Sequence, residues 1–462
     1  MALRIDYTNM LAGAVSGGIP ADAWAAAERD FAATHAAVKK LQGTGALGFL
    51  DLPRDKTLHD RSRDFAKAAR GKFDDLVLLG IGGSALGPIA LHAALNARDW
   101  NTLTKKERRG RPRFHVLDNV DPGTIAHVMG RVDLARTLFI VISKSGGTAE
   151  TMAQYLIVRG ALNEALGAKA GEHLVFVTDP EKGALRDIAR QEGIAAVDIP
   201  PNVGGRFSVL SPVGILPAAL LGVRTTPLLA GAADMARRCR AATLRENPGA
   251  VFGVLQWLAD VHLHRGLHVL MPYSDPLRDV SDWFVQLWAE SLGKHRAPDD
   301  AGVGPTPIAS HGATDQHSQV QLFMEGTPNK TVSFIQVGEH PVDVAIPKLH
   351  QDVPELAYLG GHHLGELIDI ERRATAGALA RRGRPNLTIH LEHADEWHLG
   401  ALIMLLEVAT VYAGQLYGVN ALNQPGVELG KQFTYAMLGR ADAGAARREW
   451  ETLPKPDPDA SV

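Results

Sequence analysis

Residues 143–148 read Ser-Lys-Ser-Gly-Gly-Thr, and this short stretch combines three hydroxyls, one ammonium and two glycines. Ser143, Ser145 and Thr148 can donate hydrogen bonds, and the glycines leave the backbone N–H groups open to a ligand. The pattern predicts a helix beginning near Thr148, whose N-terminus would favour an anion. A terminal phosphate would suit this set together with Lys144. The alternative is a helix cap involving Glu150, although a cap uses only one hydroxyl.

A second glycine-rich segment, residues 80–88 (GIGGSALGP), follows a short apolar run. Its first six residues match the G-x-G-x-x-A dinucleotide fingerprint, but Asp118, the acidic residue ending the next strand, lies further along than usual. The segment is compatible with a packing turn, with a phosphate or sugar site at Gly83 and Ser84, or with a dinucleotide site. No G-x-x-x-x-G-K-[ST] motif occurs, which argues against nucleoside triphosphate chemistry.

Charged side chains near glycines or predicted helix ends are the candidates for acid/base work. Glu290 lies near the end of a predicted amphipathic helix, and Arg206 follows two glycines that would let its guanidinium turn into a cleft. A fixed positive charge there could stabilise an anionic intermediate. By residue type alone, these two side chains, His317 and Lys431 also fit ordinary surface or ion-paired roles.

Composition excludes several classes of function. The 462 residues carry a formal net charge of -3, so the basic excess of a nucleic-acid binder is absent, and the basic clusters at 105–113 and 372–384 are interpreted as solvated faces. The single cysteine, Cys239, indicates a reducing compartment, and no secretory signal or membrane span is predicted. We therefore expect a cytoplasmic protein that binds neither nucleic acid nor membrane.

Histidines at 362–363 and 390–398 lack the H-E-x-x-H spacing, so no metal site is predicted.

Strand-like and helical patterns alternate along most of the chain, which predicts an α/β fold with mostly parallel, doubly wound sheets. Strands are expected at 74–80, 113–118, 137–143, 173–178, 195–199, 267–271, 331–337 and 386–391. Helices are expected at 21–42, 148–166, within 229–265, and near 277–292, 314–325, 363–382 and 395–417. Ligands in such folds bind beyond the carboxyl ends of the strands.

Six segments resemble those of the phosphoglucose isomerase family, in that family's order along the chain. They are GIGGSALGP (80–88), ISKSGGTAET (142–151), GGRFSVLSPVG (204–214), QLWAESLGK (286–294), TDQHSQVQ (314–321) and NQPGVELGKQ (423–432). The resemblance spans roughly residues 70–440. Pro425 replaces the tryptophan of longer relatives, and the phosphate loop carries smaller residues than theirs, which leaves substrate selectivity and dimer details open.

The resemblance implies an isomerase that interconverts glucose 6-phosphate and fructose 6-phosphate without metal or organic cofactor. It assigns Glu290 as the catalytic base, Arg206 as the stabiliser of the enediolate, His317 as the ring-opening acid/base, and Lys431 as a helper at the ring oxygen. His317 is expected from the neighbouring subunit of a homodimer. The substrate-binding residues it implies are Gly83, Ser84, Ser143, Lys144, Ser145, Thr148 and Gln424, and Glu150 would orient the phosphate loop.

The same resemblance predicts two sugar-isomerase (SIS) domains. Residues 1–70 would form an N-terminal helical segment, 71–225 the first domain, 226–445 the second domain and 446–462 a tail. Two other function classes stay open: a phosphosugar sensor without turnover, and a nicotinamide-dependent dehydrogenase based on residues 80–85. A sensor would not need Glu290, His317 and Lys431 together.

Overall fold

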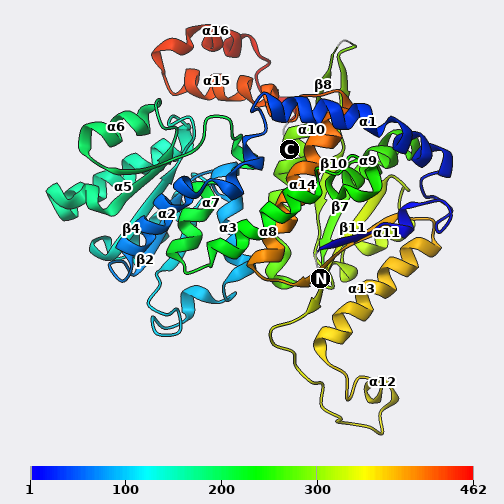
Figure 1. Ribbon diagram of the computed structural model, residues 1–462. Coiled ribbons are helices and arrows are strands. Elements are labelled where there is room, and N and C mark those ends of the chain that lie inside the picture. The colour runs from blue at the N-terminus through cyan, green and yellow to red at the C-terminus, as the bar shows by residue number, and fades with distance from the viewer. Residues whose placement is uncertain (1–2, 298, 461–462) are drawn as a thin grey trace. The chain divides into compact units, whose positions relative to one another are not determined.

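The computed structural model describes residues 3–297 and 299–460, and the chain divides after Ala421 into two compact units. The first unit contains two five-stranded sheets and most of the helices (Figure 1). The second unit contains helices α15 (Glu428–Met437) and α16 (Gly444–Thr452). The predicted α/β architecture with mostly parallel sheets is confirmed.

The first sheet is entirely parallel and has the order β3-β2-β4-β5-β6. Its strands are β2 (Asp75–Leu79), β3 (Arg113–Leu117), β4 (Thr137–Ile142), β5 (Leu174–Thr178) and β6 (Ala195–Asp198). The connecting helices are α3 (Leu86–Leu95), α4 (Pro122–Arg131), α5 (Ala149–Leu166) and α6 (Ala184–Glu192). All of these strands were expected from the sequence to within about two residues at each end.

Helices cover both faces of this sheet because successive side chains of a strand point to opposite sides. Leu76 and Leu78 of β2 pack in one apolar cluster with α2 (Lys56–Ala69) and α7 (Pro212–Leu220). Val77 and Leu79 pack in the other cluster, with residues of α4, α5 and α6. Every residue of β2 is buried, and after Asp75 its residues 76–79 are all apolar.

The second sheet has the order β1-β12-β11-β7-β10, with β1 antiparallel at one edge and the other four strands parallel. Its strands are β1 (Arg4–Asp6), β7 (Leu267–Pro272), β10 (Thr306–Ala309), β11 (Lys330–Glu339) and β12 (Asn386–His393). A small hairpin, β8 (Lys294–Arg296) and β9 (Ala301–Val303), lies outside both sheets. The sequence patterns did not indicate β1, β10 or this hairpin, because each is only three or four residues long.

Helix α14 (Glu396–Tyr417) is the central helix beside the second sheet. It packs against α8 (Thr225–Arg238), α9 (Pro248–Leu263) and α1 (Ala21–Gly43). It is long and apolar enough to cross a membrane, but 89% of its most apolar window is buried inside the protein, as in the core helix of a globular fold.

Helix α10 (Arg278–Leu292) packs against α3, which follows the first glycine-rich loop. The buried side of α10 includes Trp283, Phe284, Leu287 and Trp288, at the spacing of one helical face. Helix α10 also contacts the short turns Gly82–Ser84 and Gly205–Phe207, which follow strands β2 and β6 of the first sheet. The remaining helices named below are α11 (Val320–Glu325), α12 (Pro354–Ala357) and α13 (Leu364–Arg381).

The predicted domain boundaries at residues 70, 225 and 445 stay predictions. Strand β1 of the expected N-terminal segment pairs with β12, and α2 of the same segment packs on α7. Helix α16 runs to Thr452, past the residue where the tail was expected to begin. The mostly uncharged segment 200–221, which contains Arg206, includes α7, and Pro217 lies within that helix.

Candidate functional site

The strand order of the first sheet identifies where a ligand would bind. In sequence order its strands are arranged 2-1-3-4-5, so the chain reverses direction across the sheet between β2 and β4. Ligands of open parallel sheets bind at this switch point, beyond the carboxyl ends of the two strands. The loops that leave β2 and β4 there are residues 80–85 and 143–148, the two glycine-rich segments found in the sequence.

The three hydroxyls of the second loop converge. Ser143 Oγ lies 3.0 Å from Thr148 Oγ1, and Ser145 Oγ lies 3.4 Å from each of these oxygens. The Gly147 N–H donates to Ser145 Oγ at 3.3 Å. This loop, which we call the hydroxyl loop, therefore presents a cluster of donors to one point.

The backbone of the hydroxyl loop is held by its neighbours. Gly146 has a φ of +65°, which a side chain would strain. A Cβ on Gly183, in the loop after β5, would lie 2.5 Å from the carbonyl oxygen of Ser145, so only glycine permits this approach. Thr178 Oγ1 donates to the Ser143 carbonyl at 2.7 Å.

Thr148 is the N-cap residue of α5, but its side chain makes no capping hydrogen bond. Its hydroxyl instead lies near Ser143 and Ser145. The cap considered from the sequence is therefore not formed by this side chain. The N-terminus of an 18-residue helix lies beside the three hydroxyls, and its dipole favours a bound anion.

Lys144 takes a different direction from the hydroxyls. Its Nζ donates to the carbonyl oxygens of Pro201 and Val203, each at 2.7 Å. Burial lowers the pKa of Lys144 from its ordinary value. The ammonium thus ties the hydroxyl loop to the segment that leads into Arg206, and direct contact of Lys144 with a substrate stays a prediction.

The first glycine-rich loop needs its glycines for close contacts. Gly82 has a φ of +56°. A Cβ on Gly83 would lie 2.4 Å from the carbonyl oxygen of Gly205, so this loop and the segment carrying Arg206 touch through their backbones. Ser84 follows in a half-buried position. The loop is therefore both a packing turn and a wall of the candidate site.

Arg206 and Glu290 meet in the first unit. Arg206 Nη1 lies 3.5 Å from Glu290 Oε2, and the arginine is 3% exposed. Its Nε donates to Ser291 Oγ at 2.6 Å and its Nη2 donates to the Ala421 carbonyl at 2.5 Å. Burial lowers the pKa of Arg206, while the Glu290 carboxylate raises it. The guanidinium is thus a fixed positive charge beside a carboxylate that is one-quarter exposed.

Three residues of this site were not singled out from the sequence. Gln286 Nε2 donates to Glu290 Oε2 at 3.2 Å, and Ser291 positions Arg206. Lys294 Nζ donates to the carbonyl oxygens of Glu290 at 3.1 Å and Ser291 at 2.6 Å. Burial and the charge of Arg206 lower the pKa of Lys294 to about 8. Gln286 precedes Glu290 by four residues and Lys294 follows it by four, and side chains at this spacing are neighbours on a helix. That spacing could have indicated both residues from the sequence.

His317 ends a 3-10 turn, Thr314–His317, and is exposed. The turn is anchored through Asp315 and Gln316. Asp315 Oδ2 accepts from the His311 N–H at 2.7 Å and from Ser310 Oγ at 2.9 Å. Gln316 Oε1 accepts from Tyr273 Oη at 2.6 Å. The imidazole is therefore presented outward on a rigid support.

Lys431 and Gln424 lie in the second unit. Lys431 Nζ pairs with Glu428 at 2.9 Å on the first turns of α15, and both side chains are about half exposed. Gln424 is exposed and precedes a short 3-10 turn. The predicted roles of Lys431 and Gln424 at the sugar stay predictions.

The histidine clusters noted in the sequence have carboxylate or amide partners. His362 lies 2.8 Å from Glu366, His398 lies 2.7 Å from Asp395, and His390 lies 2.7 Å from Gln336. Within residues 3–297 and 299–460, no group of three or more histidine, cysteine or acidic side chains is arranged to hold a metal ion.

Comparison with known sequences identifies relatives over nearly the whole chain. The family model described as phosphoglucose isomerase matches residues 51–452. A glucose-6-phosphate isomerase of Carboxydothermus hydrogenoformans is 42% identical over 459 residues, which cover 97% of each chain. One of Rubrobacter xylanophilus is 47% identical over 395 residues, covering 85% of this chain and 89% of the relative.

Solved structures agree with these matches. A hypothetical protein of Thermus thermophilus superimposes with a TM-score of 0.84 at 37% identity, covering 95% of this chain and all of the other. A glucose-6-phosphate isomerase of Chlamydia trachomatis superimposes with a TM-score of 0.72 at 25% identity, covering 86% of this chain and 77% of the other.

Proposed function

This chain belongs to the phosphoglucose isomerase family, and we propose that it interconverts glucose 6-phosphate and fructose 6-phosphate. The observation that carries the proposal is the meeting of Arg206 and Glu290 at 3.5 Å, next to the loop that leaves β2 at the switch point. The hydroxyl loop leaves β4, the adjacent strand. The candidate phosphate-binding donors and the Arg206–Glu290 pair thus come from neighbouring parts of one compact unit.

The hydroxyl loop would bind the phosphate group. Ser143, Ser145 and Thr148 converge within 3.4 Å of one another beside the N-terminus of α5, and hydroxyl and backbone donors there match the acceptor oxygens of a dianion. Binding at this end would fix the distance from the phosphate to the carbonyl end of the sugar. Effective catalysis depends on such positioning.

Glu290 would move the proton. In its carboxylate form it would take the proton from C2 of the open-chain aldose and deliver a proton, exchangeable with solvent, to C1. The hydroxyl proton on the C2 oxygen passes to the C1 oxygen, which leaves a carbonyl at C2. The intermediate is an enediolate, whose negative charge Arg206 would stabilise from its fixed position. Gln286 donates to the same carboxylate oxygen that faces Arg206, so it would orient Glu290 for this transfer.

His317 and Lys431 complete the proposal as the groups that open the ring. We propose that His317 acts in the site of a partner subunit in a homodimer, since it is exposed on an anchored turn. The segment between β11 and α13, residues 340–363, includes exposed apolar side chains at Val342, Leu349 and Tyr358, which would be covered in such a dimer. Light scattering of the purified protein measures the assembly, and a monomer would contradict it.

We propose the cytoplasm as the compartment, because Cys239, the single cysteine, is a buried free thiol, as expected where thiols are kept reduced.

A coupled assay tests the proposed activity. Purified protein with fructose 6-phosphate and EDTA should produce glucose 6-phosphate, detected by a dehydrogenase specific for that product. Binding of fructose 6-phosphate without turnover would instead indicate a phosphosugar sensor. Reduction of added nicotinamide cofactor by the protein and fructose 6-phosphate, with the coupling enzyme left out, would indicate a dehydrogenase.

A further inference from the structure

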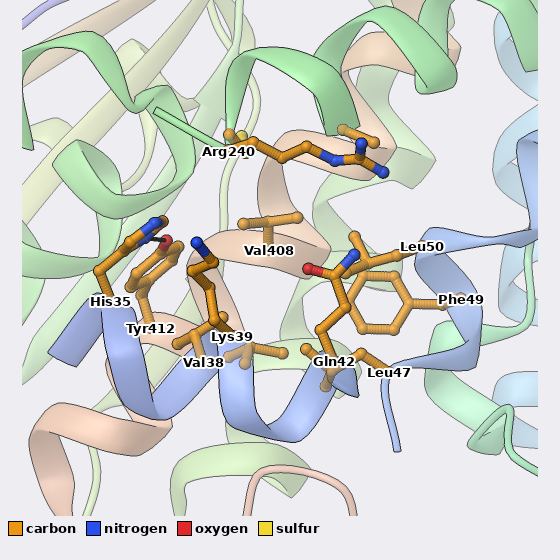
Figure 2. Close-up of a pocket in the computed structure, with 13 residues that line it drawn as sticks. His35, Val38, Lys39, Gln42, Leu47, Phe49, Leu50, Arg240, Val408 and Tyr412 are labelled. Atoms are coloured by element: carbon orange, nitrogen blue, oxygen red, sulfur yellow. Dashed lines mark hydrogen bonds between the residues drawn. The ribbon is translucent and has the colours of Figure 1, made fainter. Parts of the chain in front are cut away.

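A cavity of about 310 Å³ lies between α1, the segment 47–50, α8 and α14 (Figure 2). It shares no lining residue with the Arg206 and Glu290 site. Its body is apolar and is made by eight residues: Val38, Leu47, Phe49, Leu50, Ala236, Val408, Val411 and Tyr412. This volume is at the lower end of small-molecule pockets, which range from roughly 300 to 1,000 Å³.

The polar groups of this cavity carry positive charge or donate hydrogen bonds. Figure 2 shows Lys39 and Gln42 extending from the same helix, with Arg240 across the space from them and Val408 between. None of the 13 lining residues is acidic. Within the described part of the chain, the side chains of Lys39 and Arg240 have no ion-pair partner, although arginines nearby, such as Arg245 with Glu28, do.

His35 adds a buried donor. His35 Nδ1 lies 2.6 Å from Tyr412 Oη, which accepts from Asn247 Nδ2 at 3.0 Å. These contacts are satisfied when the tyrosine hydroxyl donates to Nδ1, which leaves the imidazole hydrogen on Nε2. His35 is 7% exposed, and its Nε2 has no hydrogen-bond partner among the described residues. Burial and Lys39 lower the pKa of His35, so the ring is a neutral donor.

From this arrangement we propose that the cavity binds a small organic carboxylate with an apolar body, and that its occupation acts on Arg206. The apolar body would contact Phe49 and Val408, and the carboxylate would lie between Lys39 and Arg240. Burial raises the pKa of Cys239 to about 12, so its thiol adds no negative charge to oppose the ligand.

The link to Arg206 is a set of direct contacts. Phe49 stacks on Phe207 with ring centroids 5.0 Å apart, and Arg206 Cζ lies 5.6 Å from the centroid of the same Phe207 ring. Asn202 Nδ2 donates to the Gly45 carbonyl at 2.9 Å, from the segment whose carbonyls hold Lys144. A ligand that contacts Phe49 would therefore restrict the position of Phe207. That residue belongs to the segment 201–207, which carries Arg206 and the carbonyls that hold Lys144.

Ligand-observed NMR tests the binding with 3-phenylpropanoate as the probe and 3-phenylpropan-1-ol as its uncharged match. We expect the full-length protein to bind the acid at least about tenfold more tightly than the alcohol, as hydrogen bonds to charged groups imply. The double variant Lys39→Gln/Arg240→Gln should lose that preference. The control Lys40→Gln/Arg237→Gln removes the same charge from nearby exposed positions and should keep it, with circular dichroism confirming the fold of both proteins.

Equal binding of acid and alcohol, no binding of either, or an acid preference that survives in the double variant would overturn the site. Binding does not depend on the proposed isomerase activity, so the two can fail separately. The effect on Arg206 rests on the proposed isomerase activity. We expect saturating 3-phenylpropanoate to change kcat or KM for fructose 6-phosphate by at least about twofold. Unchanged kinetics, or competitive inhibition that persists in the double variant, would overturn that link.

Discussion

Arg206 Nη1 lies 3.5 Å from Glu290 Oε2, and the arginine is held in place by two further contacts, to Ser291 Oγ and to the Ala421 carbonyl. The positive charge is therefore positioned before any substrate arrives. A preorganised charge costs no reorganisation when negative charge develops beside it, which is the condition for strong transition-state stabilisation.

Arg206→Lys should lower kcat for isomerisation by roughly 10²–10³, with KM changed only a few-fold, because the stabilised charge exists only in the transition state. Lysine keeps the charge but not the guanidinium fork that contacts Ser291 and Ala421. Steady-state kinetics measures the effect. Arg224→Lys, at an exposed arginine paired with Glu396, is the matched control. A raised KM with kcat intact would make Arg206 a binding residue instead.

Thr148→Val should raise KM for fructose 6-phosphate by about tenfold and leave kcat nearly unchanged, since one hydrogen bond to a charged phosphate is lost. Valine keeps the shape of threonine while removing the hydroxyl that faces Ser143. Thr124→Val, in the first turn of α4, is the control for changing a threonine at a helix start. An unchanged KM for the Thr148 variant would remove this hydroxyl from the phosphate site.

Mixing two inactive variants tests whether His317 acts in the partner's site. Homodimers of Glu290→Gln and of His317→Gln should each be nearly inactive. If the site is shared, random exchange of subunits makes half of the dimers mixed, each with one intact site, and about a quarter of the wild-type activity should appear. If His317 acts within its own subunit, no mixed dimer has an intact site and the mixture stays inactive.

Lys294 should make stability depend on pH in the alkaline range. Its pKa is lowered from 10.5 to about 8 by burial and by Arg206, so the unfolded chain binds more protons than the folded protein between these pH values. Stability from this group therefore rises with pH through that window and is flat below it. In urea unfolding, the midpoint urea concentration of the wild type should rise relative to that of Lys294→Met as the pH increases above about 8. A constant difference between the two midpoints would show that the pKa of Lys294 is not lowered in the folded protein. Lys40→Met is the exposed control.

Local patterns predicted the longer strands of both sheets, several long helices and the hydroxyl loop because these depend on residues close in sequence. The continuous apolar run of β4 and the hydroxyl-and-glycine stretch after it are adjacent, so the strand and its loop could be recognised together. Strand β1 could not be recognised, because its three residues become a strand only by pairing with β12 near the other end of the chain.

The meeting of Arg206 and Glu290 did not follow from composition or spacing, and only the family resemblance placed both residues in one site. Tertiary packing brings them together, through α10 against α3 and through the contact between Gly83 and Gly205. The direction of Lys144 was also beyond local reasoning, since its acceptors are the carbonyls of residues 201 and 203.

The proton transfer by Glu290 is the central claim, and Glu290→Gln in deuterated water tests it most directly. Wild-type enzyme should exchange solvent deuterium into the sugar at the carbons adjacent to the moving carbonyl while it isomerises. The variant should bind fructose 6-phosphate, seen by ³¹P NMR, yet show kcat and deuterium incorporation reduced by roughly 10²–10⁴, the range for loss of a general base. A variant that still isomerises and exchanges deuterium within tenfold or so of the wild-type rate would contradict the account.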